Sequence, residues 1–156
     1  MTSTPPASPD TLQWSDAYLL GFDPMDQVHE EFVGLVARMQ VAEAAELPAL
    51  LDAFAVHAQA HFQAEDNWMR ETEFPARECH IDEHAAVLKS VHEVRELLAQ
   101  GDGVAVCREL VNELARWFPG HADHLDSTLA HWMCKKRLGG KPVVIRRHIG
   151  SGHVPG

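Results

Sequence analysis

The segment HFQAEDNWM, residues 61–69, places a histidine and a glutamate, His61 and Glu65, four residues apart. The segment FPARECHIDEH, residues 74–84, follows soon after and places His80 and His84 four residues apart as well. Four residues of α-helix advance about 6 Å and turn slightly past a full circle, so each pair shares one helix face. Such pairs on facing helices could close around a metal ion, although their spacing could equally be chance.

Amphipathic helical patterns extend to both sides of these pairs and divide the chain into four predicted helices. Asp23 is the expected N-cap of the first helix, Pro24 stands at its first helical position, and Gly101 is a typical C-terminal glycine of the third. The helices are expected at about residues 23–45, 48–73, 76–100 and 102–134. Short connections between four amphipathic helices predict an all-α fold, an antiparallel up-down-up-down four-helix bundle.

The expected organisation is one domain with an extension at each end. Residues 1–12 are rich in proline, serine and threonine and read as a flexible leader. Residues 13–134 form the predicted bundle, preceded by an N-terminal arm that Trp14 anchors. Residues 135–156 form a basic C-terminal tail, which is expected to fold back across the acidic bundle or to contact a protein partner or anionic lipid.

The composition narrows the class of protein. The 156 residues are 46% hydrophobic, which indicates a folded chain, and the formal net charge of −10 argues against nucleic acid as a partner. Residues 1–134 hold all 23 acids but only 7 of the 13 lysines and arginines. The three cysteines include no CxxC pair, and no signal peptide or transmembrane segment is visible, so the cytoplasm is the expected location.

Every predicted helix carries at least one histidine or acid on its inward face. The inward candidates are His29, His61, Glu65, His80, His84, His121 and Asp126. One such histidine alone is usually a hydrogen-bonded core residue, but burying all seven groups without compensation is costly, because each unpaired group costs about 1–3 kcal/mol. Seven ligands are too many for one tetrahedral zinc ion and fit two octahedral ions better, and imidazole with carboxylate suits iron.

The fourth helix contains two irregularities near its candidates. His121 and Asp126 are five residues apart, about 140° around an α-helix, so they are expected to flank the inward direction rather than share it. Pro119 and Gly120 directly precede His121. Proline removes one backbone hydrogen bond and glycine loosens the turn, which predicts a tolerated kink or a reoriented His121.

The order H…HxxxE…HxxxH…HxxxxD resembles the hemerythrins, especially the bacterial ones. The motifs that carry this resemblance are DQVH, HFQAED and FPARECHIDEH, together with a tryptophan four residues before His121. The resemblance covers about residues 14–130 and includes all seven candidate positions. It implies a non-haem di-iron site inside a four-helix bundle, an architecture that myohemerythrin exemplifies.

The resemblance also implies a division of the ligands between two non-haem irons. His80, His84 and His121 would hold one iron, His29 and His61 the other, and Glu65, Asp126 and an oxo or hydroxo group would bridge them. The iron with two histidines would keep an open position for dioxygen. The implied function is reversible dioxygen binding for storage, delivery or sensing, rather than catalysis by a hydrolase, since no dedicated catalytic acid or nucleophile accompanies the site.

Further side chains are expected around the open position. The expected apolar lining is Phe54, Ala58, Phe62 and Trp117. His57 lies one turn before His61 and is either a proton donor near the open iron or a polar residue at the bundle end. His124 raises the same question beside Asp126.

Two other functions remain open at this stage. A di-iron enzyme could reduce dioxygen, peroxide or nitric oxide, and proton delivery by His57 would favour it. An iron-handling or sensing protein could use its basic tail as the output element. Ferritin-like bundles use Glu-x-x-His, whereas this chain carries HxxxE and HxxxH.

Overall fold

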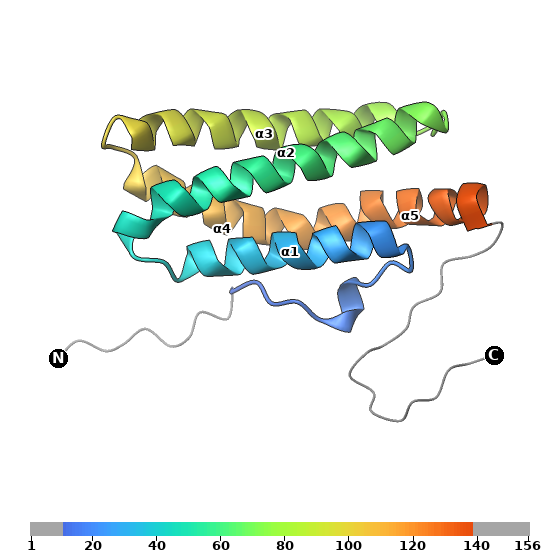
Figure 1. The fold of residues 1–156 in the computed structure, drawn as a ribbon, viewed down its shortest axis with the longest axis horizontal. Coiled ribbons are helices and arrows are strands. Elements are labelled where there is room, and N and C mark those ends of the chain that lie inside the picture. The colour runs from blue at the N-terminus through green and yellow to red at the C-terminus, as the bar shows by residue number, and fades with distance from the viewer. Residues whose placement is uncertain (1–10, 139–156) are drawn as a thin grey trace, which may run out of the picture.

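The computed structural model describes residues 11–138 and is helical, without a strand among those residues. Three long helices, α1 (Asp23–Gln40), α2 (Leu47–Glu71) and α3 (Arg77–Ala99), are followed by a fourth helical run from Val104 to Leu138. The helix α1 packs against α2 and the fourth run, and α3 packs against the same two neighbours (Figure 1). This arrangement confirms the predicted four-helix bundle.

The start and end of α1 differ from the prediction. Phe22 is the N-cap and makes no side-chain capping hydrogen bond, and Asp23 is the first helical residue. The helix ends at Gln40 rather than near Ala45, and a short 3-10 helix, η2 (Ala44–Glu46), leads into α2. Reciprocal hydrogen bonds of a capping box hold this 3-10 turn. Residues 41–46 contain no proline or glycine, so the sequence does not mark the true end of α1.

The N-terminal arm lies along the bundle and includes the 3-10 turn η1 (Asp16–Tyr18). Leu12, which the prediction placed in the leader, is buried in the core, and its backbone N–H donates to Gln40 Oε1 at 2.8 Å. Trp14 is partly buried and packs on Tyr18 with ring centroids 5.7 Å apart. The arm is therefore fastened by Leu12 as well as by Trp14.

The turn between arm and bundle is held by a buried carboxylate. Asp26 accepts hydrogen bonds from the backbone N–H groups of Leu20 and Gly21, at 2.8 and 3.0 Å. Burial raises the pKa of Asp26, although these two hydrogen bonds oppose the rise. The acid that the sequence places in the first turn of α1 thus fixes the entering chain.

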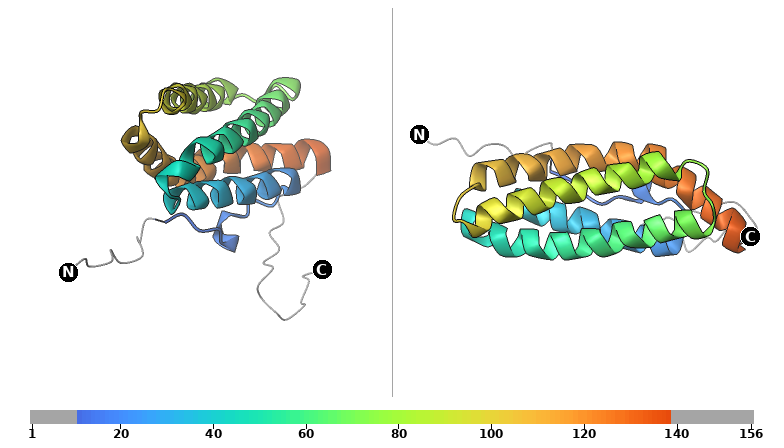
Figure 2. Two further views of the ribbon diagram at one scale, coloured as in Figure 1. Left: turned by 60° about the vertical axis from the view of Figure 1, so that its left-hand side comes forward. Right: turned by 90° about the horizontal axis from the view of Figure 1, so that it is seen from above.

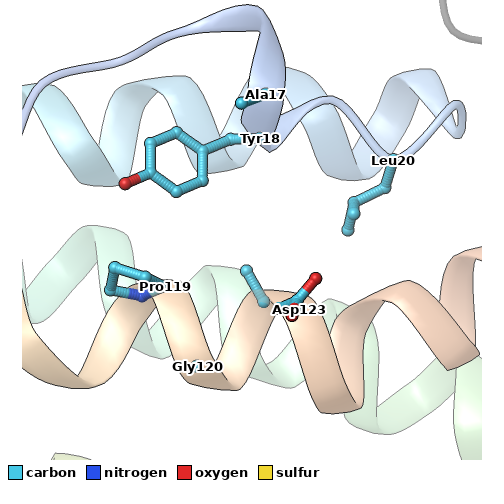
Figure 3. Close-up of a pocket in the computed structure, with 7 residues that line it drawn as sticks. Ala17, Tyr18, Leu20, Pro119, Gly120 and Asp123 are labelled. Carbon is cyan, nitrogen blue, oxygen red and sulfur yellow. The ribbon is translucent and has the colours of Figure 1, made fainter.

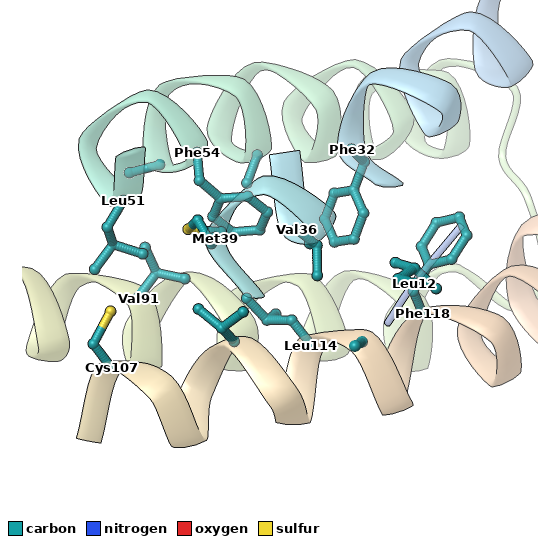
Figure 4. Close-up of a cluster of buried hydrophobic side chains, with 14 of the residues drawn as sticks. Leu12, Phe32, Val36, Met39, Leu51, Phe54, Val91, Cys107, Leu114 and Phe118 are labelled. Atoms are coloured by element: carbon teal, nitrogen blue, oxygen red, sulfur yellow. The ribbon is translucent and has the colours of Figure 1, made fainter. Parts of the chain in front are cut away.

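The apolar core is divided into two clusters. The larger cluster extends along the bundle from Leu51 and Cys107 to Leu12 and Phe118 (Figure 4). The smaller cluster contains Phe22, Met25, Met69, Phe74, Leu129, Ala130, Met133 and Cys134. Along α1, α2 and the fourth run, the candidate ligands lie between the residues of these two clusters, so a polar layer separates two apolar ones.

The fourth run is continuous but changes its helical type. It consists of α4 (Val104–His121), the π-helical segment η3 (Ala122–Asp126), α5 (Ser127–Met133) and a second π-helical segment, η4 (Cys134–Leu138) (Figure 2). Pro119 lies inside α4 and does not end it. The run continues past the predicted end at Cys134, because no helix breaker occurs before the glycines at 139 and 140.

The predicted glycine terminus of α3 is confirmed. Gly101 has a φ of +80°, and the N–H groups of Gly101 and Asp102 bond back to the carbonyls of Leu98 and Leu97. Among the helices of residues 11–138, none is long and apolar enough to cross a membrane. The structural description ends before most of the basic tail, so the expected contacts of that tail lie outside the described residues.

Candidate metal centre

All seven candidates that the sequence analysis selected lie together inside the bundle. His29 comes from α1, His61 and Glu65 from α2, His80 and His84 from α3, His121 from the end of α4 and Asp126 from the end of η3. None of the seven residues is more than 5% exposed. Each helix of the bundle therefore contributes at least one buried nitrogen or oxygen to a single cluster.

Glu65 lies at the centre of the cluster and turns its two oxygens in different directions. Its Oε2 atom is 2.8 Å from His61 Nε2 and 3.3 Å from His29 Nε2. Its Oε1 atom is 3.2 Å from His84 Nε2 and 3.5 Å from His80 Nε2. One carboxylate thus faces two histidines with one oxygen and two different histidines with the other.

Asp126 divides its oxygens in the same way. Its Oδ1 atom is 2.8 Å from His80 Nε2 and 3.2 Å from His121 Nε2, and its Oδ2 atom is 3.1 Å from His29 Nε2. Two groups of converging ligand atoms result, each with all atoms within 4.8 Å of one another. The three-histidine group consists of Glu65, His80, His84, His121 and Asp126. The two-histidine group consists of His29, His61 and Glu65.

The π-helical segment η3 places Asp126 in the cluster. Its residues follow His121 directly. In a π-helix the backbone hydrogen bonds join residues five apart rather than four, so each hydrogen-bonded turn holds one more residue than in an α-helix. His121 and Asp126 therefore come to the same side, with 3.2 Å between Nε2 and Oδ1. The expectation that they flank the inward direction assumed α-helical geometry and is wrong for this reason.

The electrostatics of the cluster favour charged groups despite their burial. Burial lowers the pKa of His29, but the charges and hydrogen bonds of Asp126 and Glu65 outweigh it and raise that pKa to about 10. Burial likewise lowers the pKa of His80, and the hydrogen bonds to both carboxylates raise it to about 9. Burial raises the pKa of Glu65, yet the charge of His61 and the hydrogen bonds from the histidines hold it well below its usual range.

This balance shows what the cluster can bind. A carboxylate pair surrounded by imidazoles holds protons when no cation is present, and a metal ion would take the place of those protons. His84 Nε2 and His121 Nε2 lie 3.3 Å apart. Two neighbouring ligands, each about 2.1 Å from one octahedral ion, are separated by about 3 Å, so this spacing fits a shared cation.

Two outer carboxylates that the sequence analysis did not select contact the ligands from behind. Asp66 Oδ1 is 2.7 Å from His84 Nδ1, and Glu83 Oε1 is 2.9 Å from His121 Nδ1. Asp66 directly follows Glu65 in the sequence, and Glu83 directly precedes His84. This adjacency to a ligand is the signal that could have identified both, but only the packing of α2, α3 and α4 shows which histidine each one reaches.

Aromatic side chains cover the three-histidine group. Phe62 stacks on His84 with centroids 4.1 Å apart and an interplanar angle of 7°. Trp117 stacks on His121 with centroids also 4.1 Å apart. Trp117 was expected beside the two-histidine group, but its closest stacking contact is with the three-histidine group.

A second set of aromatic rings covers the two-histidine group. Phe118 packs edge-on against His29 at 5.4 Å, and Phe32 packs edge-on against His61 at 5.8 Å. Phe54 and Ala58, which were expected to line the open position, are both fully buried, and Phe54 contacts Phe32 at 5.2 Å. Phe32 and Phe118 are thus wall residues that the sequence analysis did not select for this role.

The two additional histidines occupy different environments. His57 packs edge-on against His61 with ring centroids 5.8 Å apart, and its Nδ1 is 3.5 Å from Oε2 of the exposed Glu31. Burial and the neighbouring His61 lower the pKa of His57. His124 is exposed on η3, where its backbone carbonyl accepts a hydrogen bond from Thr128.

A surface cavity of about 330 Å³ lies between the N-terminal arm and the end of α4 (Figure 3). Its lining residues are Ala17, Tyr18, Leu20, Pro119, Gly120, Ala122 and Asp123. None of the seven cluster residues lines it, and Tyr18 packs edge-on against Phe118 at 5.5 Å. The cavity is therefore not lined by the cluster itself.

Comparison with known proteins agrees with this geometry. Residues 20–133 match the family model of the hemerythrin HHE cation binding domain. The chain is 38% identical to a bacteriohemerythrin of Ralstonia nicotianae over 125 residues, which are 80% of this chain and 90% of the relative. A bacteriohemerythrin of Aquifex aeolicus is 32% identical over 68% of this chain and 85% of its own length. No solved structure gives a significant match.

Proposed function

This chain belongs to the hemerythrin family, and from that premise we propose that it binds dioxygen reversibly at two non-haem iron ions joined by an oxo or hydroxo bridge. The observation that carries the proposal is the division of the carboxylate oxygens. Glu65 and Asp126 each direct one oxygen toward the three-histidine group and the other toward the two-histidine group. Bridging carboxylates require this arrangement.

The donor set supports two ions of unequal coordination. His80, His84 and His121 would hold one iron, and His29 and His61 would hold the other, with both carboxylates shared. The second ion then has one protein ligand fewer, which leaves a position for a small ligand. When bound, the two irons supply the electrons that dioxygen takes up on binding.

The surrounding residues suit a ligand that is apolar and must be protected from water. Phe118 and Phe32 pack against the rings of His29 and His61, and both are almost fully buried. Excluding water from this side hinders protonation and loss of a bound oxygen species. The wall therefore favours reversible binding over reduction.

The alternative is an enzyme that reduces dioxygen, peroxide or nitric oxide at the same ions. The observation that favours it is His57, which lies between the ring of His61 and the exposed carboxylate of Glu31. A histidine in this place could carry protons from the surface toward the two-histidine group.

An ultraviolet–visible spectrum with iron analysis tests the proposal, on protein reduced without oxygen and then exposed to air. We expect two irons per chain and a visible charge-transfer band that appears with air and bleaches on deoxygenation. Immediate irreversible oxidation with two irons bound would instead establish the reductase alternative. Absence of iron from protein that was supplied with it would contradict both.

A matched pair of variants tests whether the cluster is the iron site. Glu65→Ala should lose both irons and destabilise the metal-free bundle by about 3–5 kcal/mol, because several buried histidines lose their partner. Glu93→Ala, at an exposed position of α3, should keep both irons and wild-type stability. Full iron content in Glu65→Ala would show that the irons are held elsewhere.

A further inference from the structure

The five cluster histidines differ in the hydrogen-bond partner of their outer ring nitrogen, Nδ1. The Nδ1 atoms of His84 and His121 each face a carboxylate, at 2.7 and 2.9 Å. The Nδ1 atoms of His29, His61 and His80 are buried and have no hydrogen-bond partner among residues 11–138. The outer carboxylates thus serve only the three-histidine group.

A carboxylate behind a histidine fixes which nitrogen can bind a metal. An ionised carboxylate only accepts hydrogen bonds, so Nδ1 of His84 and of His121 must carry the proton. When a metal ion replaces the proton on Nε2, the lone pair of each Nε2 atom would then point into the cluster, on the side of Glu65 or Asp126. His29 and His61 receive no such orientation from an outer carboxylate.

Both outer carboxylates also connect neighbouring helices. Asp66 of α2 reaches His84 of α3, and its side chain is only 14% exposed. Glu83 of α3 reaches His121 of α4, and it is 45% exposed. The interaction of Asp66 is shorter and less screened by solvent, so its effect on the site should be the larger one.

Glu83 holds a second group in addition to His121. The indole Nε1 of Trp117 donates to Glu83 Oε1 at 3.1 Å, and the indole ring stacks on the imidazole of His121. One carboxylate oxygen therefore restrains both the ligand ring and the aromatic ring that covers it.

We propose that Asp66 and Glu83 are positioning residues that make the two halves of the centre unequal in affinity. The half built on His80, His84 and His121 binds its ion first and more tightly, and the half built on His29 and His61 fills second and exchanges its ion more readily. This inference rests on the proposed two-metal site. Loss of an outer carboxylate behind a metal-bound histidine typically weakens metal binding 10- to 100-fold.

The order in which the two halves bind metal can be tested by titrating the metal-free full chain with Co(II). This ion is used as the probe because its binding can be measured without excluding air. Visible absorption and calorimetry would follow binding in the presence of a competing chelator. We expect two steps for the wild type. Asp66→Asn and Glu83→Gln should each weaken the first step by about 10- to 100-fold and leave the second step nearly unchanged.

The control is Glu113→Gln. Glu113 lines the same groove between α3 and α4 as Glu83, but it pairs with Arg116 rather than with a histidine. It should titrate like the wild type. Circular dichroism of each metal-free variant would check folding, and a general folding defect would weaken both steps together rather than the first alone.

The outcomes separate the inference from the function on which it rests. Equal weakening of both steps, or wild-type affinity in both variants, would overturn the positioning role while the two-metal site stands. Failure of the wild type to bind two Co(II) ions per chain would overturn the two-metal site and the inference with it.

Discussion

Contacts between individual side chains offset the energetic cost of burying this cluster of ionisable groups. Burial alone lowers the pKa of His29, but Asp126 and Glu65 reverse this effect. Burial alone raises the pKa of Glu65, but the charge of His61 and the hydrogen bonds from the histidines reverse it. The same atoms that pair in this network are those that would face metal ions, so the cluster is compensated either by protons or by cations. Stability of the bundle and occupation of the site are therefore linked at the level of individual side chains.

His57 is the residue whose substitution best separates oxygen binding from reduction. Burial and the neighbouring His61 lower the pKa of His57, which disfavours the charged form that a proton donor needs. We expect His57→Leu to keep both irons and to change the autoxidation rate little. A decrease of about 100-fold, which the loss of a general acid typically gives, would favour the reductase.

The measurement for this variant is the decay of the oxygenated absorption band in air. Glu31→Gln is the matched control, because it removes the exposed charge 3.5 Å from His57 without altering the partly buried ring. If both variants slow the decay together, His57 and Glu31 form a route for protons.

At the scale of the element, the helix after Pro119 shows how a local irregularity serves the site. Pro119 has no N–H to donate to the preceding turn, and the π-helical segment η3 begins three residues later, at Ala122. The wider turn brings Asp126 beside His121, which α-helical geometry would not do. The irregular segment η3 thus supplies one ligand, Asp126, and aligns it with His121 at the end of α4.

Two glycines are predicted to respond in opposite ways to substitution by alanine. Gly34 is exposed within α1 and an added Cβ atom meets nothing within 4 Å, so Gly34→Ala should stabilise the protein by about 0.5–1 kcal/mol. Gly103 has a φ of +88°, and an added Cβ would lie 2.7 Å from Leu97 Cβ. Gly103→Ala should therefore destabilise the protein by more than about 1 kcal/mol.

Chemical denaturation of the two variants with equal metal content measures both effects. Neither glycine lies in the cluster, so iron binding should be unchanged and serves as the internal control. A gain of stability in Gly103→Ala would contradict the turn geometry described for residues 101–103.

At the scale of the whole molecule, the metal-free protein should be most stable in mildly acidic solution. The pKa values of His29 and His80, about 10 and about 9, lie above the unfolded value of 6.5. Their contribution is fully present below about pH 6.5 and is lost as the pH rises through about 9–10. Glu65 and Asp126 have lowered pKa values, so their contribution is present above about pH 4 and is lost on further acidification.

Thermal unfolding of chelator-treated protein between pH 3 and pH 10 measures this dependence. We expect the Tm of the metal-free protein to fall between pH 7 and pH 10, by an amount that corresponds to a few kcal/mol. With iron bound, the metal takes the place of the protons and the alkaline loss should be much smaller. A Tm of the metal-free protein that stays constant up to pH 10 would contradict the pairing of His29 and His80 with the carboxylates.

The sequence by itself determined the fold class and selected the residues that the structure gathers. Both are local properties: residues four apart share a helix face, so His61 with Glu65 and His80 with His84 could be recognised from spacing alone. The ends of α2 and α3 followed from proline and glycine in the same way. The end of α1 did not, because no proline or glycine stands between Gln40, where the helix ends, and η2.

Only the tertiary structure decided how the gathered residues are related. Neighbouring helices determine where each carboxylate oxygen points and which histidines Asp66 and Glu83 contact. A departure from α-helical geometry, the π-helical segment η3, determines the position of Asp126. Helix periodicity encodes which side chains point inward. The distances between helices, and hence which inward side chains meet, arise from packing of the whole bundle, which no local spacing contains.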